Sequence, residues 1–167
     1  MPKESDFSKK LRDDIKDYYA GSETFTPYVG LIRDTFNSGK KPFDIWVTFY
    51  KRFYPIELKM CRALSVNFDM VMPHQESALL KIKKSGINFE ALVVIWLYKY
   101  NSKIALIIPI KKWLKIKKRT KAKSIKCEQL IDLLGTKHVM KREKIQDRTL
   151  WNVSKILGVD LYEHERH

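Results

Sequence analysis

The chain has 167 residues, of which 44% are hydrophobic, so its composition is that of a folded domain and excludes a disordered chain. Lysine and arginine number 33 against 19 acidic residues, and the net charge of +14 indicates a polyanionic partner. Nucleic acid, an anionic membrane surface and a ribosome-like or histone-like role all fit that charge. The longest apolar run, 91–98, is too short to span a bilayer.

The two cysteines, Cys61 and Cys127, show neither a disulfide framework nor the spacing of a zinc site. The N-terminal segment is polar and charged and carries no signal peptide. Together these features indicate a reducing compartment. We therefore expect a soluble intracellular protein.

Helices and strands alternate over the first two thirds of the chain. Apolar residues at helical spacing predict a helix at 6–19, and breakers make 22–41 a loop with one short strand at 28–32. Aromatic and β-branched residues predict two antiparallel strands, 43–50 and 53–60, joined by a tight turn. The elements expected next are a helix at 74–85 opened by Pro73 and closed by Gly86, strands at 89–97 and 103–110, and a short helix at 111–115.

The composition changes after residue 110. Residues 111–126 hold nine lysines and arginines and no acid. A short helix at 128–134 ends at Gly135, and apolar residues within 141–158 predict a final helix. We therefore expect a core at 1–118, followed at 119–167 by a basic linker and a C-terminal helical extension.

The predicted hairpin carries the candidate chemistry. Asp44 begins its first strand, and Glu57 and Lys59 lie two residues apart on its second strand, so their side chains point to one face. The hairpin can bring Asp44 beside them. Two carboxylates supply hard oxygen ligands for Mg²⁺, and a lysine beside them can orient a water or stabilise developing negative charge. This pattern favours phosphodiester hydrolysis.

An exposed cross-strand ion pair explains an isolated Glu-x-Lys pattern more often than catalysis does. Two features favour catalysis in this chain. The basic excess suits a protein that contacts phosphates. The motif also lies among apolar neighbours and not in a run of surface charge: Phe53, Tyr54, Ile56 and Met60.

Asp44 followed by Glu57-Leu58-Lys59 resembles the signature of the PD-(D/E)xK nuclease superfamily. Over about 28–114, the chain resembles the RecU-type Holliday-junction resolvases and their phage-encoded relatives. The residues that carry this second resemblance are Ser65, Phe68, His74, Gln75, Gly86 and Phe89. The resemblance implies an α/β restriction-endonuclease-like core, in which helices flank a mixed β-sheet in αβββαβ order.

The resemblance also implies the roles of individual residues. Asp44 and Glu57 would bind Mg²⁺, for which Mn²⁺ can substitute, with the Leu58 carbonyl as a backbone ligand. Lys59 would be the catalytic lysine, and Gln75 would lie near the metal or the scissile phosphate. The implied activity is that of a metal-dependent endodeoxyribonuclease that resolves four-way DNA junctions in recombination, repair or phage DNA processing. The implied protein is a homodimer in the cytoplasm of a bacterial or phage-infected cell.

Two positions depart from the relatives. The relatives carry a Glu close to a Phe in the first helix, whereas Ser8 follows Phe7 here. The stalk-like insertion of the bacterial resolvases has no counterpart in the short turn at 51–55. The acids near the expected position are Glu4, Asp6, Asp13 and Asp14. As candidates for the third acid we take Asp13, Asp14 and Asp34.

Further DNA contacts are expected outside the motif. Arg33, in an Arg33-Asp34 step that resembles the phage relatives, would touch DNA phosphate. A solvated loop is the alternative to phosphate contact for the basic run. Its candidate DNA-binding residues are Lys111, Lys112, Lys115, Lys117, Lys118, Arg119, Lys121 and Lys123.

Three functions compete with junction resolution. One is another PD-(D/E)xK nuclease that nicks or trims DNA, and a second is a catalytically inert nucleic-acid-binding protein on the same fold. A membrane-surface protein is disfavoured, because the basic run lacks a clean apolar face. We therefore expect DNA as the partner and no membrane.

Overall fold

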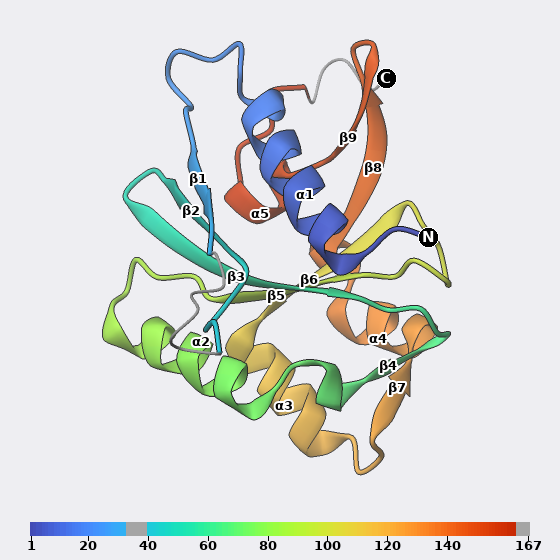
Figure 1. The fold of residues 1–167 in the computed structure, drawn as a ribbon. Coiled ribbons are helices and arrows are strands. Elements are labelled where there is room, and N and C mark those ends of the chain that lie inside the picture. The colour runs from blue at the N-terminus through green and yellow to red at the C-terminus, as the bar shows by residue number, and fades with distance from the viewer. Residues whose placement is uncertain (33–39, 163–167) are drawn as a thin grey trace.

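The computed structural model describes residues 1–32 and 40–162, which form a mixed β-sheet between two layers of helices (Figure 1). The sheet has seven strands in the order β1-β2-β3-β5-β6-β8-β9. Only the β3–β5 pair is parallel among its described neighbours. The strands are β1 (Tyr28–Leu31), β2 (Ile45–Phe49), β3 (Arg52–Met60), β5 (Leu92–Trp96), β6 (Ile104–Pro109), β8 (Val139–Ile145) and β9 (Arg148–Trp151).

The helices divide between the two faces of the sheet (Figure 1). One face carries α1 (Glu4–Tyr18) and the short α5 (Ser154–Leu157). The other face carries α2 (Pro73–Ser85), α3 (Ile110–Arg119) and α4 (Cys127–Leu134). A two-stranded ribbon, β4 (Ser65–Asn67) with β7 (Ser124–Lys126), and two 3₁₀ turns, η1 (Phe68–Met70) and η2 (Thr136–His138), complete the described chain. Among the described helices, none has the length and apolar character needed to cross a bilayer.

Local sequence signals account for most of these elements. Phe7, Leu11, Ile15 and Tyr18 are buried along one side of α1, as their helical spacing predicts. Pro73 stands in the first turn of α2, and the helix ends before Gly86. All five residues of β5 are buried, which suits a strand covered on both faces. The predicted helices and strands from 1 to 110 and the helix at 128–134 are confirmed.

The β2–β3 hairpin sets the position of the motif. Its two turn residues, Tyr50 and Lys51, have φ angles of 49° and 59°, as in the primed turns that match strand twist. Ile45 pairs with Ile56, so the nine-residue β3 extends past the start of the five-residue β2. The last residues of β3 therefore lack a β2 partner on that side.

The αβββαβ order is confirmed by α1, β1, β2, β3, α2 and β5, with the ribbon strand β4 and the turn η1 between β3 and α2. The predicted final helix at 141–158 is wrong, because this segment forms β8, β9 and only then the short α5. The two strands are joined by Gln146 and Asp147, and Gln146 has a φ of 54°. Glycine or asparagine usually occupies this backbone conformation, and glutamine seldom does. The sequence of the turn therefore gives no indication of the hairpin. β8 pairs with β6 and extends the central sheet, so this part of the chain is not a helical extension.

Candidate active site

A notch in the sheet holds the predicted catalytic residues. It lies where β3 continues past β2, and the backbone N–H groups on that edge of β3 have no strand partner. Asp44, immediately before β2, donates its own N–H to the Ile56 carbonyl at 3.0 Å, which places it opposite Glu57. The notch exists because the two strands differ in length.

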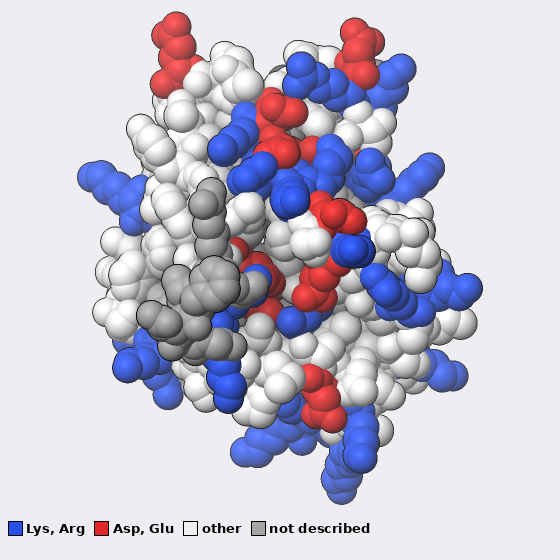
Figure 2. Space-filling view, in the orientation of Figure 1, with Lys and Arg blue, Asp and Glu red and all other residues white. Residues whose placement is uncertain are grey.

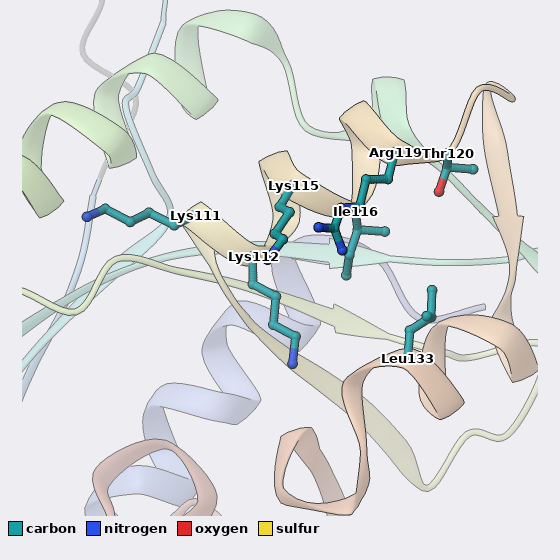
Figure 3. A pocket seen from close by; sticks show the side chains of 7 residues that line it. All are labelled: Lys111, Lys112, Lys115, Ile116, Arg119, Thr120 and Leu133. Carbon is teal, nitrogen blue, oxygen red and sulfur yellow. The ribbon is translucent and has the colours of Figure 1, made fainter.

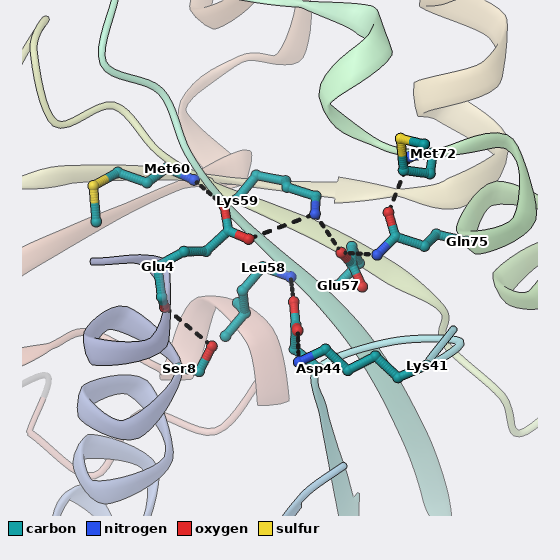
Figure 4. A network of polar contacts seen from close by, with 10 residues as sticks. All are labelled: Glu4, Ser8, Lys41, Asp44, Glu57, Leu58, Lys59, Met60, Met72 and Gln75. Carbon is teal, nitrogen blue, oxygen red and sulfur yellow. Dashed lines mark hydrogen bonds and ion pairs between the residues drawn. The ribbon is translucent and has the colours of Figure 1, made fainter. Parts of the chain in front are cut away.

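Both oxygens of Asp44 are engaged. Its Oδ2 accepts a hydrogen bond of 2.8 Å from the Leu58 N–H on the open edge of β3. Its Oδ1 lies 3.0 Å from the Lys41 ammonium. The side chain is buried, so these contacts hold the carboxylate in place at the edge of the notch (Figure 4).

Glu57 is fully buried and only half satisfied. Its Oε1 lies 2.7 Å from Lys59 Nζ and accepts a short hydrogen bond from Gln75 Nε2. Its Oε2 is buried and has no hydrogen-bond partner among the described residues. Burial, and then the negative charge of Asp44, raise the pKa of Glu57 to about 7, against the opposing effect of Lys59. An unpartnered buried carboxylate oxygen is costly, and it marks this carboxylate as open to a ligand.

Gln75 reaches the notch from the first turn of α2. Its Oε1 accepts the Met72 N–H at 3.0 Å, while its Nε2 donates to Glu57. The start of the helix, where Pro73 supplies the first turn, thus fixes the amide. The geometry makes Gln75 a positioning residue, because it acts on the orientation of Glu57.

Glu4 is the first-helix acid at the notch, and it is not among the three acids predicted from the sequence. Its Oε2 accepts the Met60 N–H at 3.2 Å, and its Oε1 lies 3.6 Å from Lys59 Nζ. Together with Asp44 it occupies the open edge of β3 (Figure 4). A signal existed in the sequence, since Glu4 shares a helical face with Leu11 and Ile15.

The structure does not bring Asp13 or Asp14 to the notch. They lie nine and ten residues after Glu4, which is about 15 Å along a helix rising 1.5 Å per residue. Asp13 pairs with Arg12 at 2.8 Å, and the buried Asp14 accepts the Trp151 N–H at 2.9 Å. Two other expected site residues, Arg33 and Asp34, lie outside the described residues.

The notch suits a cation that needs few protein ligands. Among the described residues, no group of three or more His, Cys, Asp or Glu side chains could hold a metal ion. Two carboxylates, Asp44 and Glu57, lie close enough there for the charge of Asp44 to raise the pKa of Glu57, and Glu57 Oε2 has no hydrogen-bond partner among the described residues. Mg²⁺ keeps several waters and is commonly held by one or two carboxylates, so this donor set fits Mg²⁺.

The basic run is not a single arm. It begins as α3, in which Ile110, Trp113 and Ile116 are buried and form an apolar side. The prediction that the basic run lacks an apolar face is therefore wrong. Lys117 lies 2.9 Å from Glu76 Oε1, next to Gln75 in α2. Three exposed members are Lys118, Lys121 and Lys123. Four others line a hollow between α3 and α4 (Figure 3): Lys111, Lys112, Lys115 and Arg119.

One face of the molecule combines acidic and basic side chains. Figure 2 shows acidic side chains in a hollow near the centre of this face, with lysine and arginine side chains around them. Such a distribution suits a phosphate backbone that passes over an acidic centre.

No family model matches the chain, and no curated protein matches it. Among solved structures, the chain is similar to that of Archaeoglobus fulgidus Hjc, a Holliday junction resolvase from an archaeal hyperthermophile. The two chains are 17% identical, and the similarity covers 73% of this chain and 85% of that chain, with a TM-score of 0.48.

Proposed function

We propose that this chain is a Mg²⁺-dependent endodeoxyribonuclease that resolves four-way DNA junctions by paired nicks. The observation that carries the proposal is the buried, unpartnered Oε2 of Glu57, with Asp44 and Lys59 beside it. A buried carboxylate that is incompletely paired is costly, and a bound cation would compensate that cost. An ordinary exposed ion pair, the alternative for a Glu-x-Lys pattern, does not account for the complete burial of Glu57.

Asp44, Glu57 and the Leu58 carbonyl would hold the ion, and Mn²⁺ would substitute for Mg²⁺. When bound, the ion supplies a polarised phosphoryl oxygen and a water of lowered pKa. Asp44 is already oriented by the Leu58 N–H. A bound ion would therefore displace the Lys41 ammonium from Oδ1 and keep the orientation that the Leu58 N–H sets.

Lys59 and Gln75 both contact Glu57 Oε1 and hold the carboxylate in its orientation. The Lys59 ammonium lies between Glu57 and Glu4, where it can stabilise negative charge on a phosphate or orient an attacking water. Glu4 holds that ammonium toward the notch, and Gln75 holds the Glu57 carboxylate from α2. Both are positioning residues in this proposal.

The proposed substrate is branched DNA. The net charge of +14 and the basic surroundings of the notch support contact with phosphates (Figure 2). The resemblance of 28–114 to RecU-type resolvases supports the four-way junction as the branch. A junction offers two symmetric cleavage points, so we propose a two-fold symmetric homodimer with one notch for each strand.

The test compares four labelled DNA substrates in Mg²⁺: a four-way junction, a linear duplex, a flap and a single strand. The wild type should place symmetric nicks in the junction, and Glu57→Ala and Lys59→Ala should abolish them. Asp13→Ala, which alters an exposed acid outside the notch, should cut as the wild type does.

Other results assign the chain to the competing functions. Equal cutting of all four substrates overturns junction resolution and leaves a general PD-(D/E)xK nuclease. Binding of the junction without cutting any substrate makes the chain an inert nucleic-acid-binding protein. Cutting that survives in both Glu57→Ala and Lys59→Ala removes the notch as the active site.

A further inference from the structure

A cationic groove lies between α3 and α4. The hollow that both helices line has a volume of about 440 Å³. Four side chains of α3, Lys111, Lys112, Lys115 and Arg119, surround it, and the described residues that line it include no acid (Figure 3). The aliphatic side chains of Ile116 and Leu133 form its apolar part. The groove therefore combines positive charge with an apolar surface.

Leu133 is the unusual member of this lining. It lies in α4 and is 59% exposed, although Leu130 and Leu134 of the same helix are buried. A second hollow of about 500 Å³ shares Thr120 and Leu133 with the first, and its lining includes one acid, Asp132, so the cationic part of the groove is the first hollow. Leu133 thus stands between two adjoining hollows, where an elongated ligand could cover it.

One of the cations is held in place. His138 Nδ1 lies 2.8 Å from the Ile107 carbonyl, so this nitrogen donates the hydrogen bond. Its Nε2 then accepts from Lys112 Nζ at 3.3 Å. This contact fixes Lys112 at the edge of the groove in advance of any ligand.

The groove is separate from the notch. Trp113 and Lys117 of α3 both contact Glu76 of α2, at 2.8 and 2.9 Å. Lys115 and Arg119 lie on the opposite side of the α3 axis from Lys117, because successive helical residues are about 100° apart. A ligand in the groove therefore approaches α3 from the side away from α2.

The lining argues against a nucleic acid strand as the occupant. Proteins that bind single strands stack the bases on aromatic side chains. The described lining of both hollows has no aromatic residue, and Trp113 is fully buried against Phe68 on the other side of the helix. A duplex backbone would use the cations but would offer Leu133 only its sugars, which present less apolar surface than one large apolar side chain.

We propose that the α3–α4 groove binds an acidic peptide segment that carries one large apolar side chain. The acidic side chains pair with the four cations, and the apolar side chain covers Leu133 and Ile116. The partner is thus a protein with an exposed acidic segment, recognised at a site distinct from the notch.

The test measures fluorescence anisotropy of two labelled ten-residue peptides, both rich in aspartate and glutamate. One contains a single leucine, and the other has serine at that position and the same charge. The wild type should bind the leucine peptide roughly tenfold more tightly, the factor expected when one leucine is buried. Leu133→Gln should remove this preference, whereas Ile87→Gln, which changes another exposed apolar residue, should retain it.

Charge reversals separate the groove from general attraction to a basic protein. Lys111→Glu with Lys115→Glu should weaken binding by roughly tenfold more than Lys81→Glu with Lys84→Glu, the same charge change on α2. Equal binding of the two peptides, or equal loss in the two double variants, overturns the proposal. Duplex DNA that binds the groove in a Leu133-dependent way overturns it in favour of nucleic acid. Junction cleavage in Leu133→Gln reports on the notch independently.

Discussion

Two buried carboxylates, Asp14 and Glu57, differ in how completely their oxygens are hydrogen-bonded. Asp14, on α1, accepts hydrogen bonds from Lys10 and from the Trp151 N–H, so each of its oxygens has a partner. Glu57, in the notch, uses Oε1 for two donors and leaves Oε2 without a described partner. Burial raises the pKa of both groups.

The difference distinguishes a structural acid from the acid that we propose as a metal ligand. Asp14 ties α1 to β9, which are far apart in the sequence, and a satisfied network of this kind specifies packing. Glu57 is held in orientation by Lys59 and Gln75 but not fully paired. Burial and a raised pKa are therefore shared by both sites, and the unpartnered oxygen is what singles out the notch.

The largest expected effect is the loss of cleavage in Glu57→Gln. Replacing the carboxylate by an amide removes a metal ligand and keeps the shape, so the junction-nicking rate should fall by at least about 10²-fold. The free energy of unfolding without metal is measured beside the cleavage rate, because Glu57→Gln takes the nearest counter-charge from the Lys59 ammonium and lowers stability on its own account. Asp14→Asn is the matched control and should cut normally. Similar loss in both variants would erase the distinction between the two acids.

The next largest expected effect is on the free energy of unfolding, when Asp14 is replaced. Asp14→Ala leaves the Trp151 N–H buried without its acceptor, which should lower the free energy of unfolding by about 1–3 kcal/mol. Asp13→Ala removes a surface contact with Arg12 and should change it by less than about 0.5 kcal/mol. Urea denaturation measures both. An Asp14→Ala variant as stable as Asp13→Ala would show that this network does not support the packing.

The same acid predicts a pH dependence. Burial holds the pKa of Asp14 above its ordinary value of 3.8, although Lys10 and the Trp151 N–H oppose the shift. A raised folded-state pKa contributes stability that is complete below the unfolded-state pKa and is lost as the pH rises through the folded-state pKa. The stability of Asp14→Asn relative to wild type should therefore increase as the pH rises from 3.8. A pH-independent difference would contradict this.

The smallest expected effect concerns Lys41, whose ammonium lies 3.0 Å from Asp44 Oδ1. This contact competes with a cation for the same carboxylate. Lys41→Met should therefore tighten Mn²⁺ binding in calorimetry by a factor of roughly three to ten. Lys40→Met, which removes an exposed charge nearby, should have a smaller effect. Unchanged or weaker binding in Lys41→Met would show that the ion does not use Asp44.

The sequence was sufficient where a short segment carries the information. Alternation along β3 placed Glu57 and Lys59 on one face, and the hairpin brought Asp44 to them. Pro73 and Gly86 marked the ends of α2, which delivers Gln75 to the notch. These predictions depend on backbone periodicity and on residues with restricted conformations, both of which act over a few residues.

The assignments that failed depend on contacts between distant segments. Glu4 reaches Met60 and Lys59 because α1 packs across the end of β3; its helical position puts it on the buried face but does not say which strand that face covers. The 141–158 segment forms strands because β8 pairs with β6, and its Gln146 turn has no local signature. The sequence by itself determined the central motif, the order of the helices and central-sheet strands in the first 110 residues, and the basic charge, but not β4 or η1. Only the tertiary structure decided which acid joins the notch, which carboxylate oxygen stays unpartnered and how α3 divides its lysines, because pairing and packing between distant segments override local propensity.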